Sequence, residues 1–156
     1  MRSNLLGPCL LGFLLVLIAG SMFLPAGAQT IIGSAHFDPD RFDLTYGFGV
    51  AVVEATIRFP SGPGPTVRDI NTSTILLEGS LPRSSTYLIS GGLVARFDAK
   101  MVEYIVWAKI AHVGLPAPPY KIWLTITGKL NDSAGGTPFE ATGYIKIIVP
   151  RGAGPP

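Results

Sequence analysis

Two long alternating stretches near the C-terminal end constrain the fold of this chain most strongly. Tyr120 to Leu130 and Phe139 to Val149 largely alternate apolar and polar side chains. A period of two places successive side chains on opposite faces of a β-strand. The seven residues that follow the first stretch (131–137) are rich in Asn, Asp, Ser and Gly, which favour turns. We therefore predict a β-hairpin. The side chains expected to face inward are Ile122, Leu124, Ile126, Ala141, Gly143, Ile145 and Ile147, although the opposite choice of face stays open.

The preceding part of the chain shows the same kind of pattern in shorter runs. Glycine and proline interrupt segments rich in β-branched residues, which is typical of strands joined by turns. In the longest of these segments, Val53, Ala55 and Ile57 alternate with Glu54 and Thr56, as in a strand with one wetter side. The strands expected here are Ile31 to Phe37, Phe42 to Tyr46, Val50 to Phe59, Ser73 to Leu77 and Leu93 to Phe97.

The segments that connect these strands also have recognisable sequence patterns. Asp38-Pro39-Asp40 predicts a turn, and the prolines and glycines of 60–65 predict a loop. The Ser-rich stretch 82–92 is expected to be a second loop. Asp98 is placed to cap a short amphipathic helix that reaches about Lys109, before the prolines of 116–119. We predict an all-β fold, an Ig-like antiparallel β-sandwich of about seven strands with one short helix.

The first 28 residues have the layout of a secretory signal peptide. Arg2 is their only charge, an apolar run covers residues 10–19, and the end is Ala26-Gly27-Ala28. We predict a signal peptide over 1–28 that is cleaved after Ala28, a β-sandwich domain over 29–149 and a disordered tail over 150–156. An uncleaved anchor is the alternative, although the apolar stretch is slightly short of the ~20 residues that a spanning helix needs. The expected location is secreted or at the cell surface.

Composition excludes several classes of function. Beyond residue 28 there is no cysteine, so thiol nucleophiles, thiolate metal sites and disulfides are excluded there. Removing Arg2 from the twelve basic residues leaves eleven against ten acidic ones, and they are scattered. We therefore expect no nucleic acid partner, because its electrostatic footprint is missing. The sequence contains no Gly-x-Ser-x-Gly elbow and no set of nucleophile, base and orienting group, so we expect no enzyme and no cofactor.

Several short motifs resemble a widespread, largely uncharacterised β-sandwich module of secreted and surface proteins in archaea and bacteria. In that module a DIxxSTIxLxG segment precedes VKFDRxxV and then LTVTGxLxDGTxFEGxDxIxV. The matching segments here are 67–79, 93–98 with Val102, 124–132, 137–141 and, for an opening FDPDxLxL, 37–40 with Leu44. The resemblance spans nearly all of the chain beyond residue 28. It implies a noncatalytic extracellular module, often appended to larger surface proteins, and we expect this chain to be a free-standing copy of it.

One departure from the module concerns calcium. Members often carry an acidic DxDGDGxxD stretch before the VKFD strand, but Arg83 to Gly92 contains no carboxylate here. Calcium binding implied by the resemblance therefore does not carry over at this position. The densest acidic group is Asp38, Asp40 and Asp43, which we interpret as part of a turn, because a Ca²⁺ site needs six or more oxygens.

The two histidines, His36 and His112, are expected to be structural or exposed. His36 would lie on a strand and His112 after the helix. A zinc site needs three or four ligands, and nothing near either histidine has that spacing. We expect no metal site.

Four aromatic residues, Trp107, Tyr120, Trp123 and Tyr144, are candidates for a platform that stacks on carbohydrate. Trp123 and Tyr144 project from the hairpin on the face opposite to Leu124 and Ile145, and together they are the candidate ligand-binding residues. An amphipathic helix usually covers an open sheet face. We therefore expect the helix to pack over this pair and bury it.

Asn71 and Asn131 are candidate glycosylation sites. Asn71-Thr72-Ser73 and Asn131-Asp132-Ser133 both match the acceptor pattern, and both fall in expected turns. Asn, Asp and Ser are also common in turns for conformational reasons alone.

Together these features predict a noncatalytic secreted or cell-surface module with a structural or adhesive role. One alternative is a subunit of an extracellular fibre, in which Gln29 to Phe37 adds to the sheet edge of a neighbouring copy. The other is a carbohydrate-binding domain. The expected partners are other surface proteins or the chain itself, and glycans in the second case. Contact with a membrane is expected only through an uncleaved N-terminal segment.

Overall fold

The computed structural model describes residues 29–149, so the predicted signal peptide and tail lie outside the described residues. The described part is mostly β, with one α-helix, which confirms the all-β class. Its elements are β1 (Ile31–Asp38), β2 (Arg41–Asp43), β3 (Val52–Arg58), η1 (Val67–Asp69), β4 (Ile70–Leu77), β5 (Leu81–Pro82), β6 (Ser85–Ile89), β7 (Gly92–Asp98), α2 (Ala99–Val113), β8 (Lys121–Leu130), η2 (Asp132–Ala134) and β9 (Pro138–Ile148).

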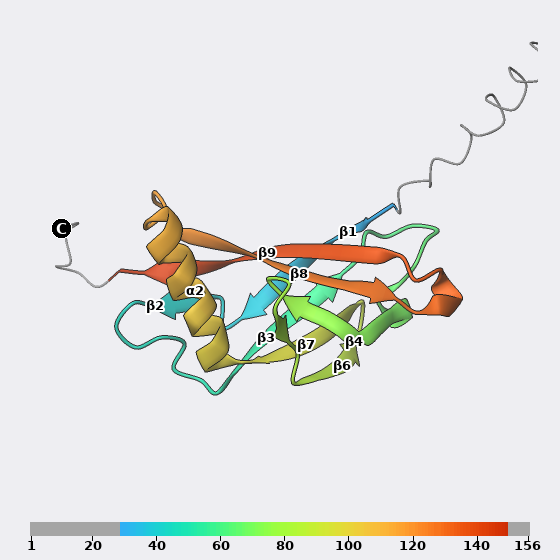
Figure 1. The fold of residues 1–156 in the computed structure, drawn as a ribbon, viewed down its shortest axis with the longest axis horizontal. Coiled ribbons are helices and arrows are strands. Elements are labelled where there is room, and N and C mark those ends of the chain that lie inside the picture. Colours follow the sequence, from blue (N-terminus) through green and yellow to red (C-terminus); the bar gives the residue numbers. More distant parts are fainter. Residues whose placement is uncertain (1–28, 150–156) are drawn as a thin grey trace, which may run out of the picture.

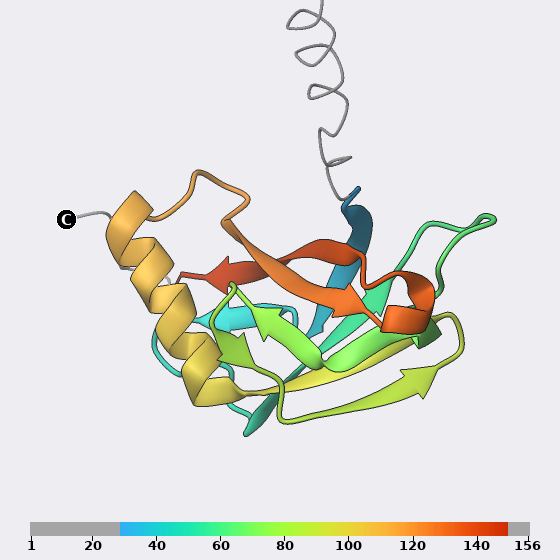
Figure 2. The ribbon, with the colours of Figure 1, turned by 45° about the vertical axis from the view of Figure 1, so that its right-hand side comes forward.

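The nine strands form one curled, mixed sheet. Its strand order is β5-β4-β8-β9-β1-β3-β7-β6, and β2 also pairs with β9. β1 and β2 both run parallel to β9, whereas the other neighbours are antiparallel. The sheet curls so that its two ends approach one another, with α2 across one end of the molecule (Figures 1 and 2). The predicted hairpin is confirmed as β8 and β9.

The structure has nine strands where the sequence predicts about seven. The two additional strands, β5 and β6, begin at Leu81 and Ser85. The prediction of a loop over 82–92 is therefore wrong. The residues of β6 do not alternate strictly between apolar and polar, so the pattern does not mark a strand. β6 forms by pairing with β7 across a turn at Ser90-Gly91, in which Gly91 has φ +72°.

A single apolar core fills the inside of the curled sheet. The predicted inward side chains of the hairpin arms are all buried, and so is Gly143. The largest fully buried side chains include Phe37 from β1, Phe97 from β7 and Phe139 from β9. These residues come from both halves of the sheet and belong to one cluster, so both halves pack on the same core.

Asp98 caps α2 as predicted, because its carboxylate accepts a 3.1 Å hydrogen bond from the backbone N–H of Met101. The helix buries Ala99, Val102 and Val106 against β3 and β7. It is longer than predicted, since it continues past Lys109 to Val113. Gly114, with φ +80°, ends it by donating its N–H to the carbonyl of Ile110.

Among residues 29–149, no helix is both long and apolar enough to cross a membrane.

Candidate functional site

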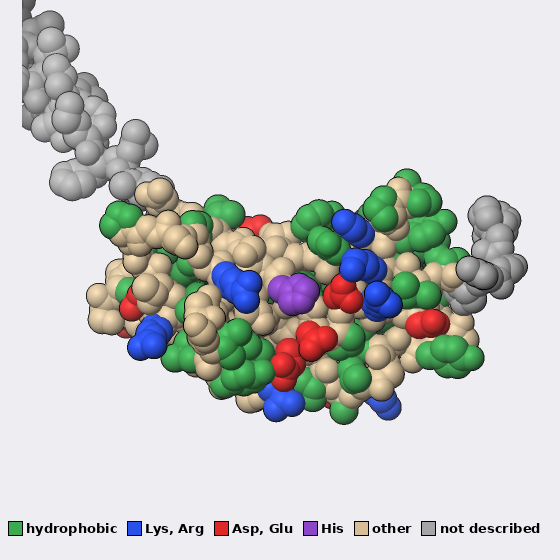
Figure 3. Space-filling model, turned by 180° about the vertical axis from the view of Figure 1, so that it is seen from behind, with side chains coloured by type: hydrophobic (Ala, Val, Ile, Leu, Met, Phe, Trp, Pro, Cys, Tyr) green, Lys and Arg blue, Asp and Glu red, His purple; other side chains and the backbone are tan. Residues whose placement is uncertain are grey.

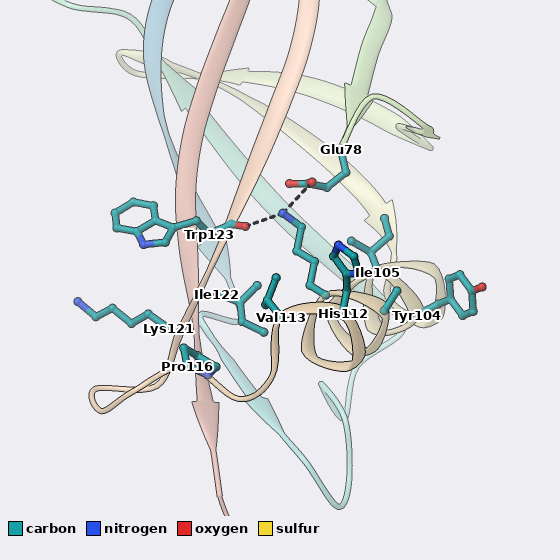
Figure 4. A pocket seen from close by; sticks show the side chains of 11 residues that line it. Glu78, Tyr104, Ile105, His112, Val113, Pro116, Lys121, Ile122 and Trp123 are labelled. Carbon is teal, nitrogen blue, oxygen red and sulfur yellow. Dashed lines mark hydrogen bonds and ion pairs between the residues drawn. The ribbon is translucent and has the colours of Figure 1, made fainter.

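Trp123 and Tyr144 lie side by side on the outer face of the sheet. They are cross-strand partners in the β8–β9 ladder, and their ring centroids are 5.3 Å apart with an interplanar angle of 70°. The Trp123 side chain is 57% exposed and Tyr144 is partly exposed. In Figure 4 the Trp123 ring points away from α2, whereas Ile122 points toward it. The expectation that the helix buries this pair is wrong, because α2 lies at the end of the sheet and not over its outer face.

Polar groups flank the two rings. The Lys121 ammonium lies 4.0 Å from the centroid of the Tyr144 ring, within the range of a cation–π interaction. Thr125 and Thr142, the next cross-strand pair on the same face, are partly exposed. We call Lys121, Trp123, Thr125, Thr142 and Tyr144 the aromatic surface. It offers one exposed indole together with hydrogen-bond donors and acceptors at its borders.

The other two candidate aromatics are not part of this surface. Trp107, on α2, packs edge-on against Phe42 at 5.7 Å between ring centroids. Tyr120 packs against the core, and its carbonyl accepts a hydrogen bond from the N–H of Ile147. The predicted platform of four rings is therefore reduced to two.

A groove between α2 and β8 was not predicted from the sequence. It has a volume of about 700 Å³ (Figure 4). Its apolar lining is Tyr104, Ile105, Ala108, Val113, Pro116, Ile122 and Trp123, so the groove borders the aromatic surface. The amphipathic pattern of 98–109 stops short of Val113, so the residues after the expected helix end could not be assigned to one face.

An ion pair closes one side of this groove. The Lys109 ammonium lies 2.8 Å from Glu78 Oε2 and donates a 3.0 Å hydrogen bond to the carbonyl of Trp123. Glu78 Oε1 accepts a 2.7 Å hydrogen bond from the N–H of Thr125. Both charges are therefore already engaged within the fold, and they offer little to a charged ligand.

The acidic group near β2 stabilises local structure. Asp40 accepts a 2.7 Å hydrogen bond from Lys146, and this bond holds the pKa of the Asp40 carboxyl below its ordinary value of 3.8. Asp43 Oδ1 accepts from the N–H groups of Thr45 and Tyr46, as in an Asx turn. Within residues 29–149, no group of three or more His, Cys, Asp or Glu side chains is placed to hold a metal ion.

The two histidines lie on different elements, β1 and α2. His36 is exposed on β1. His112 lies within α2, where it lines the groove, so the prediction that it follows the helix is wrong.

A second polar cluster lies on the outer face beside β6. The Tyr87 hydroxyl donates a 2.8 Å hydrogen bond to Glu54 Oε2, and Arg96 Nε lies 3.1 Å from Glu54 Oε1. The hydrogen bond to Glu54 raises the pKa of Tyr87 above its ordinary value of 10.0. Seen from behind Figure 1, acidic and basic side chains are mixed across the face (Figure 3).

The two candidate glycosylation sites lie at the same end of the β4–β8 pair, since Ile70 and Leu130 are cross-strand partners. Asn131 precedes η2, in a turn as expected. Asn71 was also expected in a turn, but it lies within β4, where the register against β8 shifts. Its Oδ1 accepts hydrogen bonds from the N–H and the hydroxyl of Ser73. Both side chains are partly exposed, and their glycosylation stays a prediction.

Comparison with protein-family models, with curated proteins and with solved structures finds no significant match to this chain.

Proposed function

We propose that this chain is a noncatalytic secreted or cell-surface module with an adhesive role, and that it attaches to its target through the aromatic surface. The observation that carries the proposal is the exposure of Trp123 beside Tyr144. Large aromatic rings are normally buried, and an exposed indole beside a partly exposed phenol ring is typical of a contact site.

Glycans are the ligand class that this surface suits best. The C–H groups of a sugar ring pack on the face of an indole, while its hydroxyls need hydrogen-bond partners nearby. Lys121, Thr125 and Thr142 supply such partners on either side of the rings. The rings are not coplanar, so we propose that a sugar stacks on Trp123 and contacts Tyr144 at its edge.

We further propose that the domain is an Ig-like β-sandwich in which the two halves of the curled sheet are the two layers. Both halves bury their inner faces in one core, as sandwich layers do. The resemblance to secreted surface modules supports the same proposal. We also propose that residues 1–28 are a signal peptide that is cleaved after Ala28. An N-terminal sequence beginning at Gln29 in protein recovered from its native source would support the cleavage, and one beginning at Met1 would contradict it.

Retention on immobilised glycans tests the adhesive function. Trp123→Ala is expected to weaken retention at least about tenfold, which corresponds to the loss of one stacking contact of about 1.4 kcal/mol. The matched control is Tyr46→Ala, since Tyr46 is 82% exposed, lies in the turn after β2 and is not part of the aromatic surface. Unchanged retention of Trp123→Ala, or equal loss in the control, would contradict the proposal. A reproducible hydrolase or transferase activity of the purified protein would also contradict it.

A subunit of an extracellular fibre is the second candidate. It is favoured by β6, an edge strand that could accept a strand from another copy. The strand expected to be donated, β1, lies inside the sheet between β9 and β3. Donation would therefore exchange an interior strand between copies. Light scattering of concentrated protein tests this candidate, because a fibre requires species much larger than a dimer.

A further inference from the structure

The two edges of the curled sheet are protected to very different degrees. One edge ends in β5, which has only two residues, one of them Pro82. Short edge strands and prolines prevent further strand pairing. The other edge is β6, with five residues that include neither a charge nor a proline. Natural sheets normally protect such an edge, so an unprotected one indicates a place where a strand is meant to add.

The side chains of β6 are also unusually apolar for an edge. Tyr87, Leu88 and Ile89 are all exposed, and Leu88 is 52% exposed. Figure 2 shows β6 on the outside of the sheet, beside β7. Within residues 29–149, no strand pairs with its other side.

The backbone groups of β6 that are free can be assigned from the register. Ile89 and Gly92 close a two-residue hairpin, so Ile89, Tyr87 and Ser85 are the residues that hydrogen-bond to β7. The N–H and C=O groups of Thr86 and Leu88 then point away from the sheet. They are the groups that an added strand would bind.

We propose that β6 pairs with β6 of a second copy, antiparallel about a two-fold axis at Tyr87. In this register the backbone of Thr86 in each copy hydrogen-bonds with the backbone of Leu88 in the other copy. The free N–H and C=O groups of both residues are then satisfied. Tyr87 faces its own counterpart, and Ser85 faces Ile89. The sheets of the two copies become continuous through this pair of strands.

Charge favours a second copy as the partner. Because the five residues of β6 are uncharged, pairing β6 with itself places no like charges opposite one another and meets no repulsion. The nearest preceding cation, Arg83, falls opposite Gly91 in this register. The Arg83 side chain is also turned back within its own copy, where Nε donates a 2.6 Å hydrogen bond to the carbonyl of Thr72.

The contact is small, so the dimer should be weak and dependent on concentration. Pairs of short strands bury less than the roughly 1,200 Å² of a standard stable interface. The dimer would still present two aromatic surfaces, and two linked weak contacts bind a multivalent surface more tightly than one. The pairing is independent of glycan binding and stands or falls on its own measurement.

Sedimentation of the full chain over a range of concentrations tests the proposal first. We expect a monomer–dimer equilibrium that Leu88→Lys weakens at least about tenfold, because a lysine protects the edge. Val113→Lys is the matched control, since Val113 is an exposed apolar residue on α2. Leu88 is exposed, so the variant should keep the circular dichroism of the parent. Monomers at every concentration, or equal assembly of the parent and Leu88→Lys, would overturn the proposal.

Cysteine cross-linking tests the register. In a Cys9→Ser background, Tyr87→Cys should form a disulfide-linked dimer under mild oxidation, because facing residues of a non-hydrogen-bonded pair are about 4.5 Å apart at Cα. Ser85→Cys alone should not, whereas a mixture of Ser85→Cys and Ile89→Cys should. Equal cross-linking by Ser85→Cys alone would overturn the two-fold register. In the sedimentation experiment, species larger than a dimer would overturn it too and would favour head-to-tail strand addition.

Discussion

The Lys109 ammonium lies 2.8 Å from Glu78 Oε2, and this ion pair joins α2 to the turn between β4 and β5. Glu78 is the only residue other than glycine with a positive φ among residues 29–149, at +50°. Such a conformation costs of order 1 kcal/mol for a residue with a side chain. The carboxylate offsets this cost, since it also binds the N–H of Thr125. The ion pair that joins α2 to this turn therefore depends on one residue in an unfavourable backbone conformation.

A double-mutant cycle on this pair should show coupling. Lys109→Met and Glu78→Gln are each expected to lower the free energy of unfolding by about 0.5–1 kcal/mol, because both groups are partly exposed and their attraction is screened. Glu78→Ala should cost about 1–3 kcal/mol, since it also leaves the Thr125 N–H without its acceptor. Urea denaturation measures these changes, with Lys100→Met as the control on the exposed side of α2. Additive effects of Lys109→Met and Glu78→Gln would contradict the coupling.

Gly143→Ala should destabilise the fold strongly. β1 passes so close to β9 that a Cβ at this glycine would overlap the carbonyl oxygen of Ala35. Backbone atoms cannot yield as a flexible side chain can, so we expect a loss of about 2 kcal/mol or more. Gly62→Ala is the control, because nothing lies within 4 Å of its Cβ position. The melting temperatures of the two variants check the prediction, and an unchanged value for Gly143→Ala would refute it.

The Asp40–Lys146 pair should make stability depend on pH in the acid range. Because the pKa of Asp40 is lowered in the folded state, its contribution is present above the ordinary value of 3.8. It is lost as the pH falls through the lower folded-state pKa. Asp40→Asn should therefore reduce stability slightly near neutral pH and converge with the parent in strong acid. The contribution is expected to be below about 1 kcal/mol, since both groups are partly exposed.

Thermal unfolding of Asp40→Asn and the parent between about pH 5 and pH 2 measures this difference. A constant gap between the two proteins across that range would show that the ion pair does not titrate as expected.

Glu54→Gln should lower the pKa of Tyr87. The anionic acceptor stabilises the protonated phenol, so removing its charge allows Tyr87 to ionise closer to its ordinary pKa of 10.0. A raised pKa in the folded state means that the contribution of Tyr87 to stability is present below this value and is lost at higher pH. Ultraviolet titration of phenolate formation, with Tyr87→Phe subtracted to isolate the signal, tests this prediction. Identical curves for Glu54→Gln and the parent would contradict it.

Local patterns were enough to predict much of the fold. The hairpin of β8 and β9, its inward residues and the cap at Asp98 follow from alternation and from the chemistry of a single side chain. β6 could not be predicted in this way. Its residues form a strand because β7 offers them a partner, and that pairing depends on the turn at Gly91.

The candidate site was only half predictable. Alternation correctly placed Trp123 and Tyr144 together on the outer face of the hairpin. Whether anything covers that face depends on where α2 docks, and the amphipathic pattern of a helix does not specify its partner. The groove between α2 and β8 arises from the same docking.

The sequence by itself determined the β class, the hairpin and the inward side chains of its two arms, because these depend on interactions between residues close in the chain. Tertiary structure decided three further features: the curl of the sheet, the parallel pairing of β1 with β9 and the exposure of Trp123. Each of these depends on contacts between segments that are distant in the sequence. Bringing such segments together costs loop-closure entropy, and the local pattern does not determine which of the many alternative pairings forms.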